Sequence, residues 1–308
     1  MLITSAVWLP ASLAGGAFQA WRTAIQQRLR GELTVSGAGL VRYLYGAPVA
    51  LVLATLWLSL HGQAVPATSP LFFAFAAAGG LAQVLGTNLL IMAFGYRNFV
   101  VGTAFSKTEA VQAAVFAFLA LGERLSPLAW VAVGFSVAGV LALALGGRRM
   151  TAGEVLGALG QPAALCGMGA GALFALTGVL VKRATLTLGL PDQIEAALCT
   201  LAVVMVLQTL MHGSYVLLRE PATLGRIVAT WRTSSQVGLL AALGSACWFT
   251  GFAMAPVALV RVVGQVEVVF TLGFSRFYLK EKTRPHEVAG LCLVVVGVVL
   301  ALVGARSS

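Results

Sequence analysis

Charged residues are scarce in this sequence. Only 10% of its 308 residues are Asp, Glu, Lys or Arg, and just ten are acidic, whereas a soluble domain has about 25% charged residues. This shortage excludes an ordinary soluble globular fold. The net charge is +10, but no basic run exceeds two residues. A nucleic-acid partner is therefore not expected.

The sequence also lacks the motifs of most enzymes. It has no Gly-rich phosphate loop, no zinc-ligand spacing and no nucleophile elbow. Its four cysteines stand singly in apolar stretches, which is typical of small packing residues. Its three histidines lie near the ends of apolar segments and indicate no metal or catalytic site. We therefore expect no enzymatic activity, no cofactor and no bound metal.

Long apolar runs dominate the chain instead. Hydrophobic residues make up 59% of it, and the mean hydropathy is +0.93. About 20 apolar residues cross a bilayer as a helix, whereas barrel strands would be about half as long and would alternate with polar residues. We therefore predict an all-α membrane protein with ten transmembrane helices, at 4–27, 36–60, 70–94, 99–121, 127–146, 155–181, 192–217, 236–257, 259–279 and 286–305.

An internal repeat relates the two halves of the chain. With an offset of 158, Gly80–Gly146 aligns on Gly238–Gly304 without a gap. The matched pairs include Glu109 with Glu267, Glu123 with Glu281, and Pro127 with Pro285. Each half then holds five helices, and because five is odd the second half enters the membrane from the opposite side. The prediction is two inverted-topology repeats, over 1–150 and 151–308, which is the architecture of many secondary transporters.

Short motifs add a family resemblance. A turn reading "GERL" or "KEKT" follows the fourth and ninth segments, an arginine opens the second in "VRYLYGAPVALV", and the fifth and tenth read "AGVLALALG" and "VGVVLALVG". In order and spacing the chain resembles the EamA family of the drug/metabolite transporter superfamily. The resemblance implies transport of small metabolites through a cavity walled by helices 1, 3, 4, 6, 8 and 9, with helices 5 and 10 as scaffold.

The chain departs from the family at one point. Members often carry a proline just after the position of Glu109 or Glu267, where this chain has Ala110 and Val268. The sequence therefore gives no reason to expect the helix kink that such a proline supplies.

Several charges lie inside the apolar segments. A charge at the bilayer centre costs about 2.5–3.5 kcal/mol, so it usually faces a partner or a wet cavity. Arg22 and Lys107 lie deep in their segments. Arg42, Arg261 and Arg276 lie within about two helical turns of a predicted end, from which long side chains can reach the interface. We expect this for Arg42 and Arg276, and for Arg261 we leave it open against a place in the cavity.

These charges and the polar residues on the same helix faces form the candidate substrate site. Its members are Gln19, Arg22, Gln26, Gln83, Asn88, Thr103, Lys107, Trp248, Arg261 and Gln265. A cavity with both signs of charge suits a zwitterionic or anionic metabolite. The alternative is structural, with buried ion pairs such as Lys107 with Glu267, or Arg22 with Glu109, that lock helices together. Glu123 and Glu281, at helix ends, are expected to have capping or interface roles.

Glu109 and Glu267 are the candidates for coupling transport to protons. Burial disfavours the charged form of a carboxyl group and a nearby cation favours it, so a change of neighbours changes its proton affinity. We favour Glu109 because Lys107 lies two residues before it. The equivalent position, two residues before Glu267, is the uncharged Gln265. Side chains at i and i+2 do not face each other, so a neighbouring helix must complete the pair.

The expected function is secondary active transport of a small polar metabolite, in a bacterial inner membrane, with the lipid bilayer and protons as further partners. A lipid-carrier flippase on the same fold and a membrane enzyme are the alternatives. The direction of transport is open, and so is the orientation. Eleven of the twenty Lys and Arg fall in the loops of one side and four in those of the other. The positive-inside rule then puts the termini outside, whereas the family resemblance implies termini inside.

Overall fold

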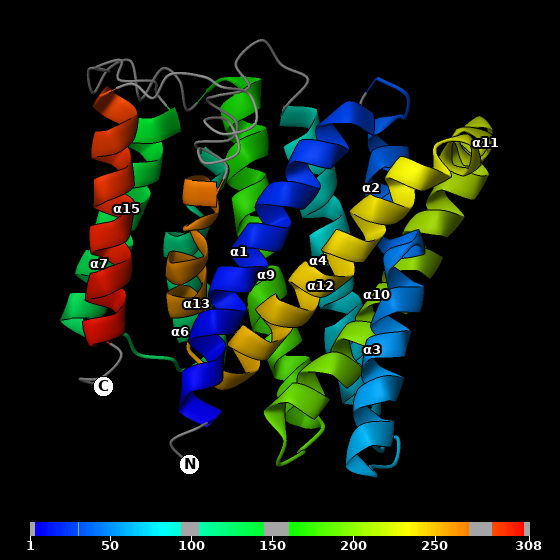
Figure 1. The fold of residues 1–308 in the computed structure, drawn as a ribbon, viewed down its shortest axis with the longest axis horizontal. Helices are drawn as coiled ribbons and strands as arrows, with labels where there is room; N and C mark the ends of the chain where they lie inside the picture. Colours follow the sequence, from blue (N-terminus) through cyan, green and yellow to red (C-terminus); the bar gives the residue numbers. More distant parts are fainter. Residues whose placement is uncertain (1–3, 30, 94–104, 145–159, 271–284, 305–308) are drawn as a thin grey trace. The chain divides into compact units, whose positions relative to one another are not determined.

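The computed structural model describes residues 4–29, 31–93, 105–144, 160–270 and 285–304, and every regular element in these ranges is a helix (Figure 1). The helices are α1 Thr4–Leu29, α2 Val35–Leu44, α3 Gly46–His61, α4 Pro70–Ala93, α6 Glu109–Leu121, α7 Pro127–Ala144, α9 Pro162–Thr187, α10 Gln193–Arg219, α11 Pro221–Ala229, α12 Trp231–Met254, α13 Val257–Gly264 and α15 Pro285–Gly304. The predicted all-α class is confirmed.

Five described stretches are long and apolar enough to cross a membrane. They are Val35–His61, which contains α2 and α3, and the helices α4, α9, α10 and α12. Shorter apolar helices cover Glu109–Leu121, Pro127–Leu143 and Val288–Gly304. α1 has 26 residues but is not among the five, and Gln19, Arg22 and Gln26 interrupt its apolar surface. Ten membrane spans remain a prediction.

The turn after α6 explains the "GERL" motif. Gly122 has a φ of 68°, in the left-handed region that favours glycine. The N–H groups of Gly122 and Glu123 donate to the carbonyls of Phe118 and Ala117, which satisfies the last carbonyls of the helix. The sequence thus ends this helix with its own C-terminal cap, and it brings Glu123 to the start of the next connection.

The chain forms two compact units. Unit 1 comprises Met1–Val84 and Thr177–Ala255, and unit 2 comprises Leu85–Leu176 and Pro256–Ser308. Each unit combines residues from both predicted halves, so the compact units do not coincide with the sequence repeats. The division of the chain into repeats at 1–150 and 151–308 stays a prediction.

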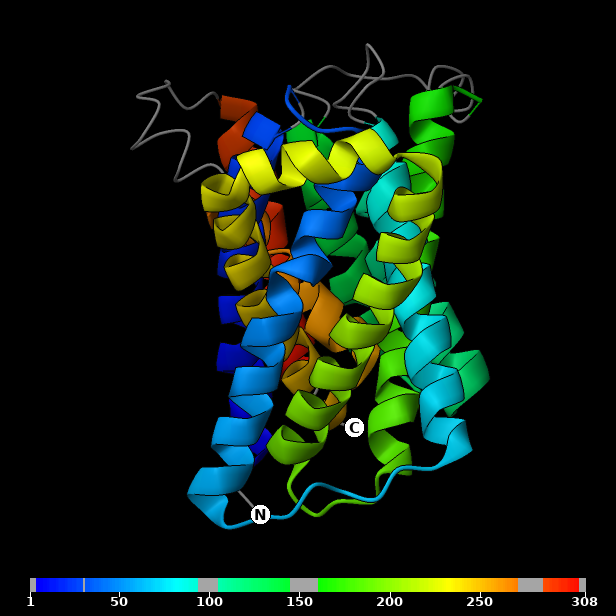
Figure 2. The same ribbon diagram turned by 90° about the vertical axis from the view of Figure 1, so that its right-hand side faces the viewer.

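Unit 1 is built on the packing of α1 against α12, with α10 lying against α2, α3 and α12. Glycine allows the close approach: a Cβ on Gly15 would lie 3.2 Å from the Trp248 ring. The largest fully buried side chains of this unit include Tyr43, Phe249 and Phe252. The sequence did not predict α11, which lies across the ends of its neighbours α2, α10 and α12 rather than along them (Figure 2).

Unit 2 centres on α7 and α15, which pack at glycine positions. A Cβ on Gly139 would lie 2.7 Å from the Gly290 carbonyl oxygen, and one on Gly297 would lie 2.9 Å from the Ala132 oxygen. From the first contact to the second, the residue number falls along α7 and rises along α15, so the two helices are antiparallel. The repeat offset of 158 relates the two contacts: Gly139 corresponds to Gly297, and Ala132 corresponds to Gly290.

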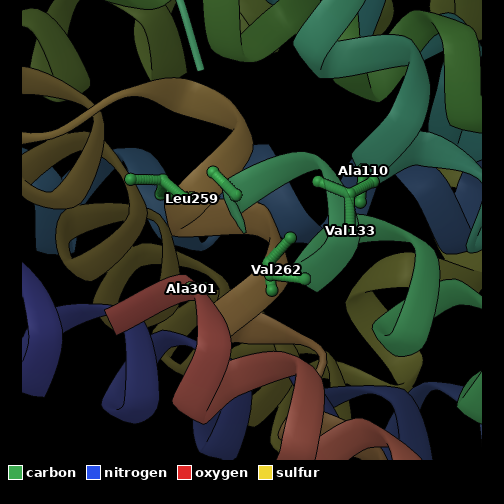
Figure 3. Close-up of a cluster of buried hydrophobic side chains, with 7 residues drawn as sticks. Ala110, Val133, Leu259, Val262 and Ala301 are labelled. Carbon is green, nitrogen blue, oxygen red and sulfur yellow. The ribbon is translucent and has the colours of Figure 1, made fainter. Parts of the chain in front are cut away.

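The apolar core of unit 2 joins four helices. Ala110 of α6, Val133 of α7, Leu259 and Val262 of α13, and Ala301 of α15 form one buried cluster (Figure 3). Small side chains dominate it, which lets the helix backbones come close, as is usual between membrane helices. This core holds α6 and α13 beside each other.

Each helix of that pair borders a short break in the run of helical residues. One break lies at Lys107–Thr108, just before α6, and the other at Gln265–Val266, just after α13. Neither break contains a proline, so the helices are interrupted here without the residue whose absence had led us to expect no kink. Thr108 Oγ1 donates to the Phe105 carbonyl at 2.6 Å, a side-chain bond that competes with helical pairing.

The two breaks have the same hydrogen bonds at the repeat offset. Thr108 N donates to Phe105 O at 3.3 Å, as Val266 N does to Val263 O at 3.1 Å. Val111 N donates to Thr108 O at 3.0 Å, and Val269 N, its equivalent, donates to Val266 O at 2.9 Å. These i to i−3 bonds tighten the backbone into 3₁₀-type turns.

Candidate functional site

Two ion pairs lie between the two breaks of unit 2. Lys107 Nζ is 2.8 Å from Glu267 Oε2, and Arg261 Nε is 2.7 Å from Glu109 Oε1. All four side chains are largely buried, with exposed fractions of 18% and 12% in the first pair and 12% and 15% in the second. Two cations face two carboxylates, so the group, called here the charge cluster, is neutral.

The local structure explains why these side chains meet. Glu109 is the first residue of α6 and Glu267 is the first residue after the second break. A carboxylate in the first turn of a helix is favoured by the helix dipole. α6 and α13 run antiparallel, since Lys107 lies beside Gln265 and Glu123 lies beside Val257 at the other end. Each break is therefore brought next to the other.

Gln265 links the two breaks directly. Its Nε2 donates to the Lys107 carbonyl oxygen at 3.4 Å, and its side chain is buried. Lys107 and Gln265 are equivalent residues of the repeat, 158 positions apart. A helix break leaves backbone carbonyls without helical donors, and a side-chain amide satisfies one of them here.

Arg261 is held at a second point as well as by Glu109. Its Nη2 donates to the Phe174 carbonyl oxygen in α9 at 3.1 Å. α9 also touches the segment before the first break, because a Cβ on Gly171 would lie 2.8 Å from the Ser106 carbonyl oxygen. Two helices, α6 and α9, therefore hold this arginine, and α9 itself packs on the segment before the first break.

The structure shows where two arginines and one lysine lie relative to expectation. The Lys107–Glu267 pair, foreseen as the structural alternative, is present. Arg261 is not a side chain that extends to the interface, since it binds Glu109 inside the unit. The expectation for Arg42 is wrong as well: it is 4% exposed, with its guanidinium 5.4 Å from the centre of the Tyr43 ring. Arg276 lies outside the described residues.

Glu109 has a cation partner that the sequence did not suggest. The sequence suggested Lys107 in the same helix, or Arg22 of the first helix. Glu109 forms an ion pair with Arg261, and Lys107 forms one with Glu267. Lys107 and Glu109 would not face each other even in a continuous helix, and the break at Lys107–Thr108 lies between Lys107 and the start of α6.

The predicted substrate-site residues are divided between the units. Unit 1 contains Gln19, Arg22, Gln26, Gln83 and Trp248, and unit 2 contains Asn88, Lys107, Arg261 and Gln265 together with Glu109 and Glu267. Thr103 lies outside the described residues. The structure brings Lys107 and Arg261 together with both glutamates, and it adds Gln265 to them.

In unit 1 the expected polar residues have structural contacts. Gln26 Nε2 donates to the Ala38 carbonyl oxygen at 2.6 Å, joining α1 to α2. Trp248 packs against Gly15 and stacks on Phe252, with the two rings 6.1 Å apart. Gln19 and Arg22 are on the same helix as Gln26, and Arg22 is buried.

Sequence reasoning missed a neutral network in the same unit. Gln208 of α10 is fully buried, and its Nε2 donates to Gln83 Oε1 at 2.7 Å and to the Gly80 carbonyl at 3.2 Å. Tyr43 OH donates to the Gln83 carbonyl oxygen at 3.3 Å. A single glutamine inside the apolar run of 192–217 was the available signal, but the family resemblance put that helix outside the cavity.

Glu123 has the capping role expected of it. Its Oε2 accepts a hydrogen bond from the N–H of Val257, the first residue of α13, at 2.9 Å. Glu281 lies outside the described residues. Within the ranges that the structure describes, no three His, Cys, Asp or Glu side chains are placed to hold a metal ion. The charge cluster itself offers ionic and hydrogen-bonding groups from side chains.

These features define a class of protein: an all-helical, multi-pass membrane protein that buries balanced charges. Residues 161–303 match the EamA-like transporter family, part of the drug/metabolite transporter superfamily, and this confirms the expected resemblance over that segment. A solved structure described only as "Crystal structure of protein" is similar with a TM-score of 0.70 and 17% identity, covering 97% of this chain and 98% of its own. This likeness shows a shared fold alone. No curated protein matches the chain.

Proposed function

We propose that this protein is a secondary active transporter of a small polar metabolite, zwitterionic or anionic, that works by alternating access in a bacterial inner membrane. The match of residues 161–303 to a transporter family supports this class. An ion gradient is the natural energy source, because the sequence has no ATP-binding motif. Protonation of a glutamate in the charge cluster would couple transport to a proton gradient.

The proposed architecture is ten membrane helices in two inverted repeats. Support comes from unit 2, where the α7–α15 contacts at Gly139 and Gly297 exchange under the offset of 158. A two-fold operation that exchanges antiparallel helices has its axis perpendicular to them. For helices that cross a membrane, such an axis lies in the membrane plane, as inverted repeats require.

One observation carries the functional proposal: four buried charges of unit 2 meet at two matched helix breaks. Broken helices place backbone groups and side chains at substrate sites in many transporters. Intramembrane charges are costly and usually mark a pathway or a binding site. The candidate residues of unit 1 stay predictions, as does the direction of transport.

The test is transport by the purified protein in liposomes, with a panel of labelled amino acids and carboxylates. We expect exchange of at least one panel member across the membrane, and its accumulation when a pH gradient is imposed. Lys107→Gln removes a cluster cation and should reduce uptake at least tenfold. Arg226→Gln, at an exposed position on α11, is the matched control and should transport normally.

Two results would contradict the proposal. One is the absence of exchange for every member of the panel by protein that is folded and correctly inserted. The other is full transport by Lys107→Gln, which would leave the charge cluster with a structural role only.

A further inference from the structure

Two side-chain amides bind adjacent residues of the first helix break. Gln265 Nε2 donates to the Lys107 carbonyl oxygen at 3.4 Å, and Gln112 Nε2 donates to Thr108 Oγ1 at 3.0 Å. Each amide therefore presents its nitrogen to the break. The two amide oxygens, Gln265 Oε1 and Gln112 Oε1, are buried and have no hydrogen-bond donor among the residues that the structure describes. Two acceptors beside this break are thus unsatisfied.

The orientation of the Gln265 amide is fixed by its contact with Lys107. Turning the amide over would place Gln265 Oε1 against the Lys107 carbonyl oxygen, where two acceptors cannot form a hydrogen bond. Gln265 is only 6% exposed, so its oxygen does not reach bulk water either. A buried acceptor without a donor costs free energy, and native proteins keep few of them. This one therefore requires a physical explanation.

The position of Gln265 provides that explanation. Gln265 lies in the second break, two residues before Glu267. Its amide rests on Lys107, whose ammonium group forms the ion pair with Glu267. Gln265 Oε1 therefore belongs to the same junction of α6 and α13 as the charge cluster. A substrate bound by the charge cluster would lie near this oxygen and could supply the missing donor.

We propose that Gln265 selects the substrate: its Oε1 accepts a hydrogen bond from a hydroxyl or ammonium group that the substrate carries in addition to its carboxylate. The bond belongs to the substrate-bound state, since Gln265 Oε1 is closed to solvent in the structure. Carboxylates without such a donor leave the acceptor unsatisfied and are rejected. This inference rests on the proposed transport function and names the group by which the substrate is chosen.

The experiment compares substrates that differ only in the donor group. Each amino acid of the liposome panel is paired with the hydroxy acid and the plain carboxylic acid of the same carbon skeleton, as alanine is with lactate and propionate. In the wild type we expect the amino or the hydroxy member to exchange at least about tenfold faster than the plain acid, because only the plain acid leaves Gln265 Oε1 without a donor. The faster of the two members identifies the donor as ammonium or hydroxyl.

Gln265→Met separates this contact from a structural role. Methionine is similar in length but has no carbonyl oxygen, so the preference for the donor-bearing member should fall below about twofold. A purely structural role predicts a different result, in which all members of a set slow by the same factor and the preference stays.

Gln208→Leu is the matched control for this variant. Gln208 is also buried, its Nε2 is bonded and its Oε1 has no donor among the described residues, but it lies in the neutral network of unit 1. Gln208→Leu should therefore keep the full preference. The ratio of exchange rates within a set does not depend on how much protein folds, so a less stable variant still reports it.

Three results would overturn the inference. One is wild-type protein that exchanges the plain acids as fast as their amino and hydroxy counterparts. The second is a preference that survives in Gln265→Met, which would leave Gln265 Oε1 to a bound water. The third is a preference that disappears in Gln208→Leu, which would place the selection in unit 1. The wild-type ratio decides the matter even where Gln265→Met fails to fold. Failure of the transport proposal is distinguishable, because it is the absence of exchange for every panel member, whereas this inference fails when exchange occurs without preference.

Discussion

Where α4 meets α10 in unit 1, the buried polar contact is neutral; where α6 meets α13 in unit 2, it is charged. Gln208 and Gln83 join their helices through amide groups, whereas Lys107 and Arg261 join theirs through ion pairs. A neutral hydrogen bond can hold two helices at small cost, but buried ions pay a large desolvation penalty. Helix association alone does not require charges, so the buried charges of unit 2 indicate a functional role.

The strongest way to break this comparison is to remove one charge. Arg261→Met leaves Glu109 buried without its cation, and we expect a loss of about 3–5 kcal/mol in the free energy of unfolding. The double variant Arg261→Met with Glu109→Met should recover most of that loss, since it removes both ions. Denaturant unfolding in detergent measures both values. A single variant as stable as the wild type would show that the pair is not buried as described.

The corresponding change in unit 1 should be milder. Gln208→Leu leaves Gln83 Oε1 and the Gly80 carbonyl without their donor, at an expected cost of about 1–3 kcal/mol. Adding Gln83→Leu removes one of these orphaned groups and should restore part of the stability. Unfolding under the same detergent conditions provides the measurement. A loss as large as that of Arg261→Met would remove the difference between the two contacts.

The smallest effect sharpens the comparison within unit 2. Glu123 caps α13 and stands apart from the charge cluster, so Glu123→Ala should cost about 0.5–2 kcal/mol, as other N-terminal caps do. The exposed Glu32 supplies the control variant Glu32→Ala, which should unfold like the wild type. Transport by Glu123→Ala in liposomes should equal that of the wild type. A loss of transport as large as that of Lys107→Gln would make Glu123 a fifth member of the cluster.

Sequence reasoning located most helices and part of the site, and its failures have physical causes. Apolar length alone placed the long segments. The Lys107–Glu267 pair was predictable because buried charges are usually paired with an opposite charge. Arg261 was left open between the interface and the cavity, because its distance from the predicted helix start at 259 does not reveal its partner Glu109 on another helix. The break after Gly264, where α13 ends, was not predicted within the expected helix 259–279. No proline marks that break.

Neutral contacts were harder to foresee than charged ones. Gln208 and Gln83 are 125 residues apart. A glutamine in an apolar run does not indicate which residue it contacts, whereas a buried charge indicates a partner of opposite charge. Tyr43 could equally have been a packing aromatic or a cavity residue. Such contacts depend on which helix faces meet, and that is decided by the packing of many small side chains together.

The hydrogen bond from Gln265 to Lys107 joins equivalent positions of the two repeats, and this has an evolutionary consequence. In a symmetric dimer of two identical five-helix chains, the same contact would join two copies of the same residue. Two lysines there would repel each other, and two glutamines would leave the neighbouring glutamates without this cation. Two copies that have diverged in sequence can place one lysine at that point, whether they are fused in one chain or paired as separate chains. The lysine of this contact is thus a property that divergence of the two predicted repeats makes accessible, and a dimer of identical half-length chains could not have had it.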